Sequence, residues 1–160
     1  MANYDFKQDL QDGEEGEMMM SVYLSIGHGL KFVNYNKDFK YDILMMNTEK
    51  NEEVKIEVKT DYYVDDDNDT GNMAVEIRHN KKPSGISTTK SDVFLYYFRN
   101  LQRDNVWMLK SDSLRKLIKD NISSLKRVKG GDTGSTELIL IPREKFRKAF
   151  FIDTVKRSKI

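Results

Sequence analysis

Three side chains in the first half of the chain have the types that can hold a divalent cation and act on a water molecule. Glu57 and Lys59 stand two positions apart in KIEVKTDYY, and Asp42 precedes them in YDILMMN. Mg²⁺ prefers oxygen ligands and keeps part of its water shell, so two carboxylates with a backbone carbonyl are enough to bind it. A lysine beside such a pair can orient or deprotonate a water molecule and balance the charge.

Spacing alone does not select these residues, because the acid–any–lysine pattern occurs at four places. The four copies are Asp5/Lys7, Asp38/Lys40, Glu53/Lys55 and Glu57/Lys59. Residues 41–47 and 53–60 both have the pattern of strands and should pair as an antiparallel hairpin, and the second of them alternates strictly.

The register of this hairpin decides which acidic residue meets Asp42. A four-residue loop over 48–51 places Asp42 opposite Glu57, and a two-residue loop places it opposite Lys59. Both registers put the three side chains on one face. Glu53 lies roughly 13 Å along the strand from Glu57, too far to share a cation with Asp42. A salt-bridged polar face on an ordinary half-buried strand has the same pattern, so the hairpin alone leaves both interpretations open.

The composition bounds the class of protein. The chain has 160 residues, of which 38% are hydrophobic and 33% charged, and it contains no cysteine. This length suits a single domain over 1–160. The lack of cysteine excludes disulfides and Cys-based zinc sites and suits a reducing compartment. No apolar run approaches the roughly 20 residues of a membrane span, and the N-terminus lacks the order of a signal peptide. We therefore expect a cytoplasmic protein with no membrane partner.

The net charge of +1 conceals an uneven distribution. Acidic residues gather over 5–17 and 61–69, and the last third is basic, including a predicted basic helix and tail over about 142–160. A basic half facing phosphates and an acidic pocket holding cations would suit an enzyme that acts on nucleic acid. Solvated helix faces and a disordered tail explain the same charges.

The elements that must position these residues can be read from periodicity and turn chemistry. An apolar stripe predicts a helix over 5–26, and a Ser111 or Ser113 cap predicts a second helix to about Asn121. The glycine-rich stretch 128–136 predicts a flexible loop, and Pro142 should begin a final helix to about Phe151. Strands are predicted over 29–34, 41–47, 53–60, 72–79, 92–98, 105–109 and 137–141. This order indicates a mixed α/β sheet with helices packed on it.

In these two predicted strands the chain resembles the PD-(D/E)XK nuclease superfamily. The matching residues are Asp42 and the run Glu57-Val58-Lys59, and Tyr41 stands where many members have proline. The resemblance implies a restriction-endonuclease-like core and cleavage of DNA with Mg²⁺, for which Mn²⁺ can substitute. It also implies that the two carboxylates and the Val58 carbonyl bind the metal, while Lys59 positions the attacking water.

A second match lies beyond this motif. TGNMAVEI (70–77) and KKPSGISTTKSDVFLYYF (81–98) are similar to a stretch of small phage-type nucleases of the same group. The Gly-x-x-Gly spacing before Glu17 is similar to that of archaeal junction resolvases, which act as dimers, so Glu17 on the first helix is a candidate further ligand. Glu76 is a second candidate, and a homodimer is an open expectation.

The loop after the metal hairpin carries side chains that can grip DNA phosphates. They are Lys82, Ser84, Thr88, Thr89 and Lys90. A well-capped turn explains the same residues. Of the two histidines, His28 and His79, neither has matching metal ligands in the sequence, and both read as core or surface residues.

Other readings of the sequence stay open. Asp65, Asp67, Asp69 and Glu76 have the spacing of a calcium loop, but Thr70 stands where that loop needs glycine. A solvated acidic loop is the simpler interpretation. For the whole chain, the alternatives to a nuclease are a non-catalytic nucleic-acid-binding module on the same fold and a phage accessory protein that binds a host protein.

Overall fold

The computed structural model describes residues 6–36, 38, 40–62, 67, 69–100, 103–131 and 133–156. The first sheet has six strands in the order β1 (Lys31–Tyr35), β2 (Ile43–Asn47), β3 (Glu52–Tyr62), β6 (Val93–Arg99), β7 (Arg103–Lys110) and β10 (Phe151–Lys156). The second has four, in the order β5 (Lys82–Pro83), β4 (Asn72–His79), β9 (Thr136–Pro142) and β8 (Lys126–Gly130). The helices are α1 (Phe6–His28), α2 (Ser111–Asn121) and α3 (Arg143–Phe146), with 3-10 turns η2 (Gly85–Ser87) and η3 (Arg147–Ala149).

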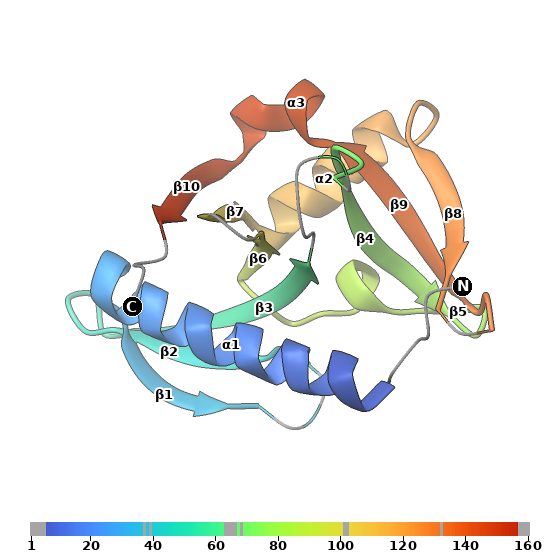
Figure 1. Cartoon of the computed structure of the whole chain (residues 1–160). Coiled ribbons are helices and arrows are strands. Elements are labelled where there is room, and N and C mark those ends of the chain that lie inside the picture. Colours follow the sequence, from blue (N-terminus) through green and yellow to red (C-terminus); the bar gives the residue numbers. More distant parts are fainter. Residues whose placement is uncertain are drawn as a thin grey trace.

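The first sheet is mixed, as the sequence predicts. Strand β3 pairs parallel with β6, and the other neighbours in this sheet pair antiparallel. Between β3 and β6 the chain leaves to build β4 and β5 of the second sheet (Figure 1). The predicted class, a central mixed sheet flanked by helices, is confirmed.

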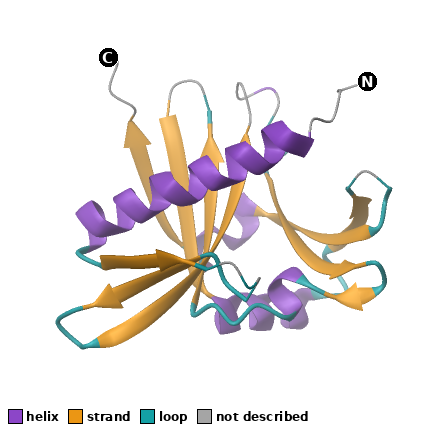
Figure 2. Ribbon diagram, turned by 90° about the horizontal axis from the view of Figure 1, so that it is seen from below, coloured by secondary structure: helices purple, strands orange, loops and turns teal. Residues whose placement is uncertain are grey.

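Two cores lie on opposite faces of the first sheet. Helix α1 crosses one face (Figure 2) and covers a cluster that includes Ile56, Leu95 and Tyr97. On the other face, Phe94 and Tyr96 pack in a cluster shared with α2 and the second sheet. Strand β6 alternates between the two cores and has only aliphatic and aromatic side chains from Val93 to Phe98, because both of its faces are buried.

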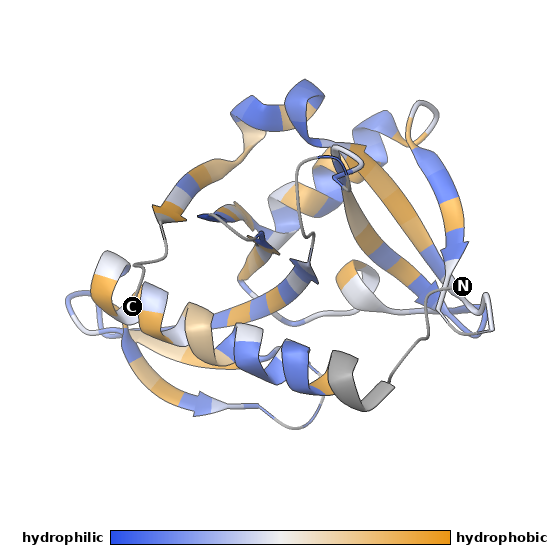
Figure 3. Cartoon of the chain, viewed as in Figure 1, coloured by the Kyte–Doolittle hydropathy of each residue, from blue (hydrophilic) through white to orange (hydrophobic). Residues whose placement is uncertain are grey.

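The second sheet contributes its own apolar strand to the shared core. Ile139 and Ile141 of β9 are fully buried there, beside Met73 and Val75 of β4. Figure 3 shows β9 as largely apolar along its length. Both sheets are therefore tied together by one cluster of side chains.

The C-terminal region differs from its sequence prediction. The helix expected from Pro142 to Phe151 is short: α3 ends at Phe146, η3 follows, and residues 151–156 form β10 at the edge of the first sheet. Phe146 and Phe150 pack inward as expected, and Ala149 is exposed. The alternation of Phe151, Asp153 and Val155 with Ile152 and Thr154 matches a strand, and β7 offers it a free edge.

Two further predictions are wrong. The first residues of the expected loop at 128–136 belong to strand β8. This strand lacks the usual apolar pattern because one of its faces is solvated and carries charged residues. Neither Ser111 nor Ser113 caps α2: the capping position is Lys110, and the Ser111 hydroxyl instead pairs with that of Ser91 at 2.7 Å. In the described residues no helix is long and apolar enough to span a membrane.

Gly16 allows α1 to lie directly on β3. A Cβ atom at this position would stand 1.9 Å from the hydroxyl oxygen of Thr60, whereas one at Gly13 would meet nothing within 4 Å. Both glycines are helical, so the contact with β3 is what distinguishes them. The close approach brings the acidic N-terminal half of α1 against the strand that carries Glu57.

We expect Gly16→Ala to destabilise the protein and Gly13→Ala to stabilise it. The first forces the helix and strand apart, which costs roughly 1–3 kcal/mol. The second gains about 0.5–1 kcal/mol, because alanine loses less backbone freedom in a helix than glycine. Thermal unfolding of the two variants measures both effects. A Gly16→Ala protein as stable as the native one would contradict the close approach of α1.

Candidate functional site

The hairpin of β2 and β3 places Asp42 opposite Glu57. The pairing runs from Asn47 with Glu52 to Ile43 with Ile56, and the Asp42 amide donates to the Ile56 carbonyl at 2.9 Å just beyond it. This is the register of a four-residue loop, as predicted. The ladder itself ends at the pair of Ile43 with Ile56, and Asp42 lies near Glu57 just past that end. Asp42 itself lies immediately before β2, at the end of the hairpin.

Hydrogen bonds hold the Asp42 and Glu57 carboxylates in place, and their surroundings raise the pKa of both. The Val58 amide donates to Asp42 Oδ2 at 2.7 Å, and the Thr89 hydroxyl lies 3.0 Å from Glu57 Oε2. Burial raises the pKa of Asp42. Burial and the charge of Asp42 together raise the pKa of Glu57 to about 8. The fold thus gathers carboxylates that resist ionisation while no cation is near.

Glu17 on α1 joins the same electrostatic group. Burial, followed by the charge of Asp42, raises its pKa to about 7. Glu14, one turn earlier, is exposed. Among the acidic residues of α1, Glu17 is therefore the one whose pKa responds to the hairpin carboxylate Asp42.

Glu76 approaches from the second sheet and is fixed by the loop that follows β4. The Ser84 hydroxyl donates to Glu76 Oε1 at 2.7 Å. Gly85 has φ of +55°, and a Cβ atom there would lie 2.4 Å from the Glu76 carbonyl oxygen. The charge of Glu76 is among those that raise the pKa of Glu57. Glycine is thus required for this loop to pack against β4.

A hard cation suits this set of donors. Asp42, Glu57 and Glu76 are each anchored through one carboxylate oxygen, which leaves the other oxygen for a ligand. Mutual repulsion in a partly dry site is what a divalent cation relieves, and oxygen donors are those that Mg²⁺ and Mn²⁺ take. In the described part of the chain no three His, Asp or Glu side chains gather closely enough to hold an ion by themselves.

Two cavities meet at the site. One of about 620 Å³ lies between α1 and the second sheet, and the other, of about 540 Å³, lies between β3 and the loop after β4. Val58, Lys59 and Glu76 line both of them. Lys59 is exposed, so its ammonium group is available to a ligand that enters either cavity.

The loop 81–90 divides into side chains that face solvent and side chains that hold the site. Lys82, Thr88 and Lys90 are exposed. The hydroxyls of Ser84 and Thr89, which the sequence offers as phosphate contacts, are instead engaged with Glu76 and Glu57. They position the carboxylates, because a hydroxyl group beside a carboxylate donates its proton to that carboxylate in a hydrogen bond.

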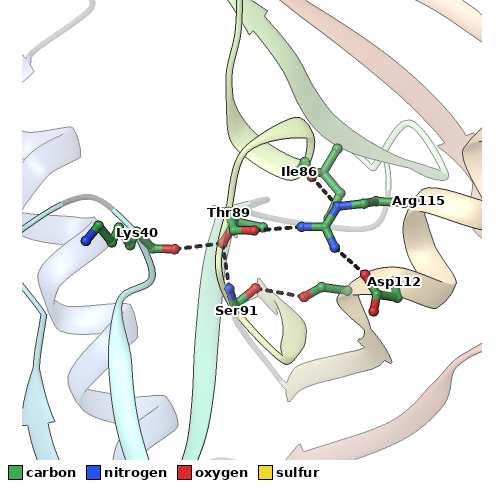
Figure 4. Close-up of polar contacts among 7 residues, drawn as sticks. Lys40, Ile86, Thr89, Ser91, Asp112 and Arg115 are labelled. Atoms are coloured by element: carbon green, nitrogen blue, oxygen red, sulfur yellow. Dashed lines mark hydrogen bonds and ion pairs between the residues drawn. The ribbon is translucent and has the colours of Figure 1, made fainter.

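Thr89 is the junction of this loop, as Figure 4 shows. Its hydroxyl lies 3.0 Å from the Lys40 carbonyl as well as from Glu57, so one proton serves two acceptors. Arg115 of α2 donates to the carbonyls of Ile86 and Thr89 at 2.8 and 2.7 Å. Arg115 also pairs with Asp112 at 2.7 Å, but the sequence gives no local signal for its two contacts to this loop, because those acceptors lie far away along the chain.

Other predicted residues find different roles. Asp69 forms an ion pair with Arg143, the first residue of α3, so its carboxylate ties the segment before β4 to the start of that helix. Asp65 lies outside the described residues. Asp61 is a carboxylate that the sequence reasoning missed: it lines the larger cavity, and burial raises its pKa. Its position two residues after Lys59, on the same strand face, is the signal that could have found it.

The fold and the site define a mixed α/β protein with a carboxylate cluster at the end of a hairpin in its central sheet. No family model matches the chain, and no curated protein does. Among solved structures, that of a bacterial homing endonuclease, I-Ssp6803I, superposes with a TM-score of 0.48 and 15% identity, over 82% of this chain and 76% of that one. At this identity the likeness assigns no chemistry to any residue.

We expect the metal-free protein to lose stability as pH rises from about 4.5 to 8. The unfolded chain gives up the Glu57 proton near 4.5, whereas the folded protein keeps it to about 8. The unfolded state therefore binds fewer protons over this range, and the free energy of unfolding falls. Replacing Glu57 with Gln removes this loss and should raise the melting temperature at pH 8 by about 2–4 °C or more, and by much less at pH 4.5.

Melting curves in EDTA at the two pH values measure this difference. Glu53→Gln is the matched control, since Glu53 is exposed on the same strand and faces no acidic partner across the hairpin. Equal pH dependence in the native and Glu57→Gln proteins would show that Glu57 is ionised normally.

Proposed function

We propose that the protein is a metal-dependent DNA endonuclease of the PD-(D/E)XK type, using Mg²⁺ or Mn²⁺. The observation that carries this proposal is the approach of Asp42 to Glu57 at the end of the hairpin, with Lys59 next on the same face of β3. The raised pKa values of the carboxylates support it, because perturbed acids gather at functional sites.

Each residue has a role that follows from its place. Asp42 and Glu57 would hold the metal, with the Val58 carbonyl as a further oxygen, and Glu17 and Glu76 complete the acidic wall. A bound divalent cation supplies charge that stabilises the scissile phosphate and lowers the pKa of a water molecule. Lys59 donates hydrogen bonds that orient the attacking water and balance the charge of the phosphate.

The rest of the site suits a polyanion. The carboxylates repel phosphate, so contacts to neighbouring phosphates must come from cations around them. Lys82 and Lys90 are exposed on the loop that holds the carboxylates, and Thr88 lies between them. Such contacts position a nucleic acid without reading its sequence.

We expect Lys59→Ala to lower the rate of nicking of supercoiled plasmid in Mg²⁺ by about 100-fold or more, because a positioned acid–base group contributes at least that much. Lys55→Ala is the matched control. It removes the lysine of the neighbouring acid–any–lysine copy on the same strand and should leave the rate near that of the native protein.

The outcomes distinguish the candidate functions. A native protein that nicks no DNA form in Mg²⁺ or Mn²⁺, or a Lys59→Ala variant as active as the native one, would overturn the nuclease assignment. Salt-sensitive DNA binding that EDTA leaves unchanged, without cleavage, would favour a binding module.

Metal binding has its own readout. We expect saturating Mg²⁺ to raise the melting temperature of the native protein, by about 5 °C or more at 100 times the dissociation constant. Asp42→Asn should abolish this rise, since it removes the charge of one ligand and keeps the shape. A rise that persists in Asp42→Asn would place the cation elsewhere.

A further inference from the structure

Strand β4 has a β-bulge just after Glu76, which shifts the alternation of its side chains between the two faces of the sheet. In β4 and β9, Glu76 pairs with Leu138, but the next pair is Arg78 with Glu137, so one extra residue, Ile77, is inserted. Ile77 packs on the shared core. After the insertion His79 pairs with Thr136, the position two residues before Leu138 on β9. His79 therefore lies on the same face as Glu76, although three residues separate them.

This bulge is held on both sides. The carbonyl of Ile77 accepts hydrogen bonds from the Ser84 amide at 3.0 Å and the Ser87 hydroxyl at 2.9 Å. Beyond His79, the residues Asn80 and Lys81 both have positive φ, 49° and 63°, in the two-residue turn to β5. A lysine in this conformation is strained, and such strain persists where the surroundings fix the backbone. Bulges of this kind re-aim side chains beside functional sites.

The side chain of His79 is oriented by its neighbour on β9. Its Nδ1 lies 2.9 Å from the Thr136 hydroxyl oxygen. When the hydroxyl donates to Nδ1, the other ring nitrogen, Nε2, carries the proton and is a donor. The described residues give Nε2 no hydrogen-bond partner, and His79 is exposed.

The cavity that His79 lines also contains two of the candidate catalytic residues, Glu57 and Lys59. His79, Glu57, Lys59 and Glu76 all line the space of about 540 Å³. Lys82 pairs with His79 across the short β4–β5 ladder and is exposed. A donor on β4, across the cavity from Glu57 of the hairpin, suits an anion that enters this cavity next to the proposed cation-binding end of the hairpin.

We propose that His79 contacts a phosphate group of the nucleic-acid substrate, as an Nε2–H donor oriented by Thr136. The proposal rests on the proposed nuclease function and adds a substrate-binding residue to it. His79 acts on a phosphate beside the one that is cleaved, so it contributes chiefly to binding and to KM. It is the bulge at Ile77 that makes this contact possible.

The test compares His79→Ala, His79→Gln, Thr136→Val and Thr136→Ser with the native protein. With Ca²⁺ in place of Mg²⁺ to prevent cleavage, we expect His79→Ala to weaken DNA binding about tenfold, with kcat in Mg²⁺ largely kept. Thr136→Val should show a smaller loss, and the two conservative variants should recover part of the affinity. His28→Ala is the matched control. His28 is the last residue of α1, far along that helix from its acidic N-terminal half, and it contacts Tyr23 and Phe151.

A second measurement tests the contact itself. Single methylphosphonate linkages, which are neutral, are placed one at a time in the DNA. If His79 contacts a phosphate, one linkage should weaken binding of the native protein and have little further effect on His79→Ala. A purely structural role for the His79–Thr136 bond predicts instead a lower melting temperature and additive effects at every linkage.

The two proposals fail separately. If the native protein cleaves DNA and His79→Ala matches it in both affinity and KM, the His79 contact is overturned and the nuclease function stands. If the native protein binds DNA without cleaving it, the same affinities still decide the contact. If it neither binds nor cleaves any DNA form, both proposals fall.

Discussion

Repulsion between acidic side chains is the constraint on which the site depends. Glu17, Asp42, Glu57 and Glu76 come from four segments, and the charges of the other three all raise the cost of ionising Glu57. These carboxylates would move apart if the backbone allowed it. The Val58 amide and the hydroxyls of Ser84 and Thr89 prevent this by holding one oxygen of three of these groups. Stability is given up locally, and in the proposed nuclease the cation would find its ligands already in place.

The scaffold makes this gathering possible through two close approaches. Gly16 lets α1 rest on β3, and Gly85 lets the loop after β4 rest on the backbone of Glu76. Between them, β3 is fixed by an antiparallel neighbour on one side and a parallel one on the other. The two cores hold the sheet from both faces, so the end of the hairpin cannot yield to the repulsion.

Local patterns predicted the part of the site that lies in one hairpin. The even loop after Asn47 sets the register, and the alternation of Val54, Ile56 and Val58 fixes the faces, so Asp42 and Glu57 could be paired from the sequence. What could not be predicted depends on distant partners. The strand β10 looks like a helix after Pro142 until β7 offers it an edge, and Arg115 meets its acceptors only in the folded chain. The face on which His79 lies likewise depends on one inserted residue. Simple alternation along β4 would place His79 on the face opposite Glu76.

The order of the strands in the second sheet also has a consequence for how the protein is made. Strand β4, which carries Glu76, precedes its long neighbour β9 by some distance along the chain, and β8 pairs only with β9. A nascent chain still lacking β9 can form the hairpin of β2 and β3, but β4 on the opposite wall then has only the two-residue strand β5 to pair with. Completion of the site therefore waits until β9 has been translated. A chain released early would carry the acidic hairpin without the surface that faces it across the cavity.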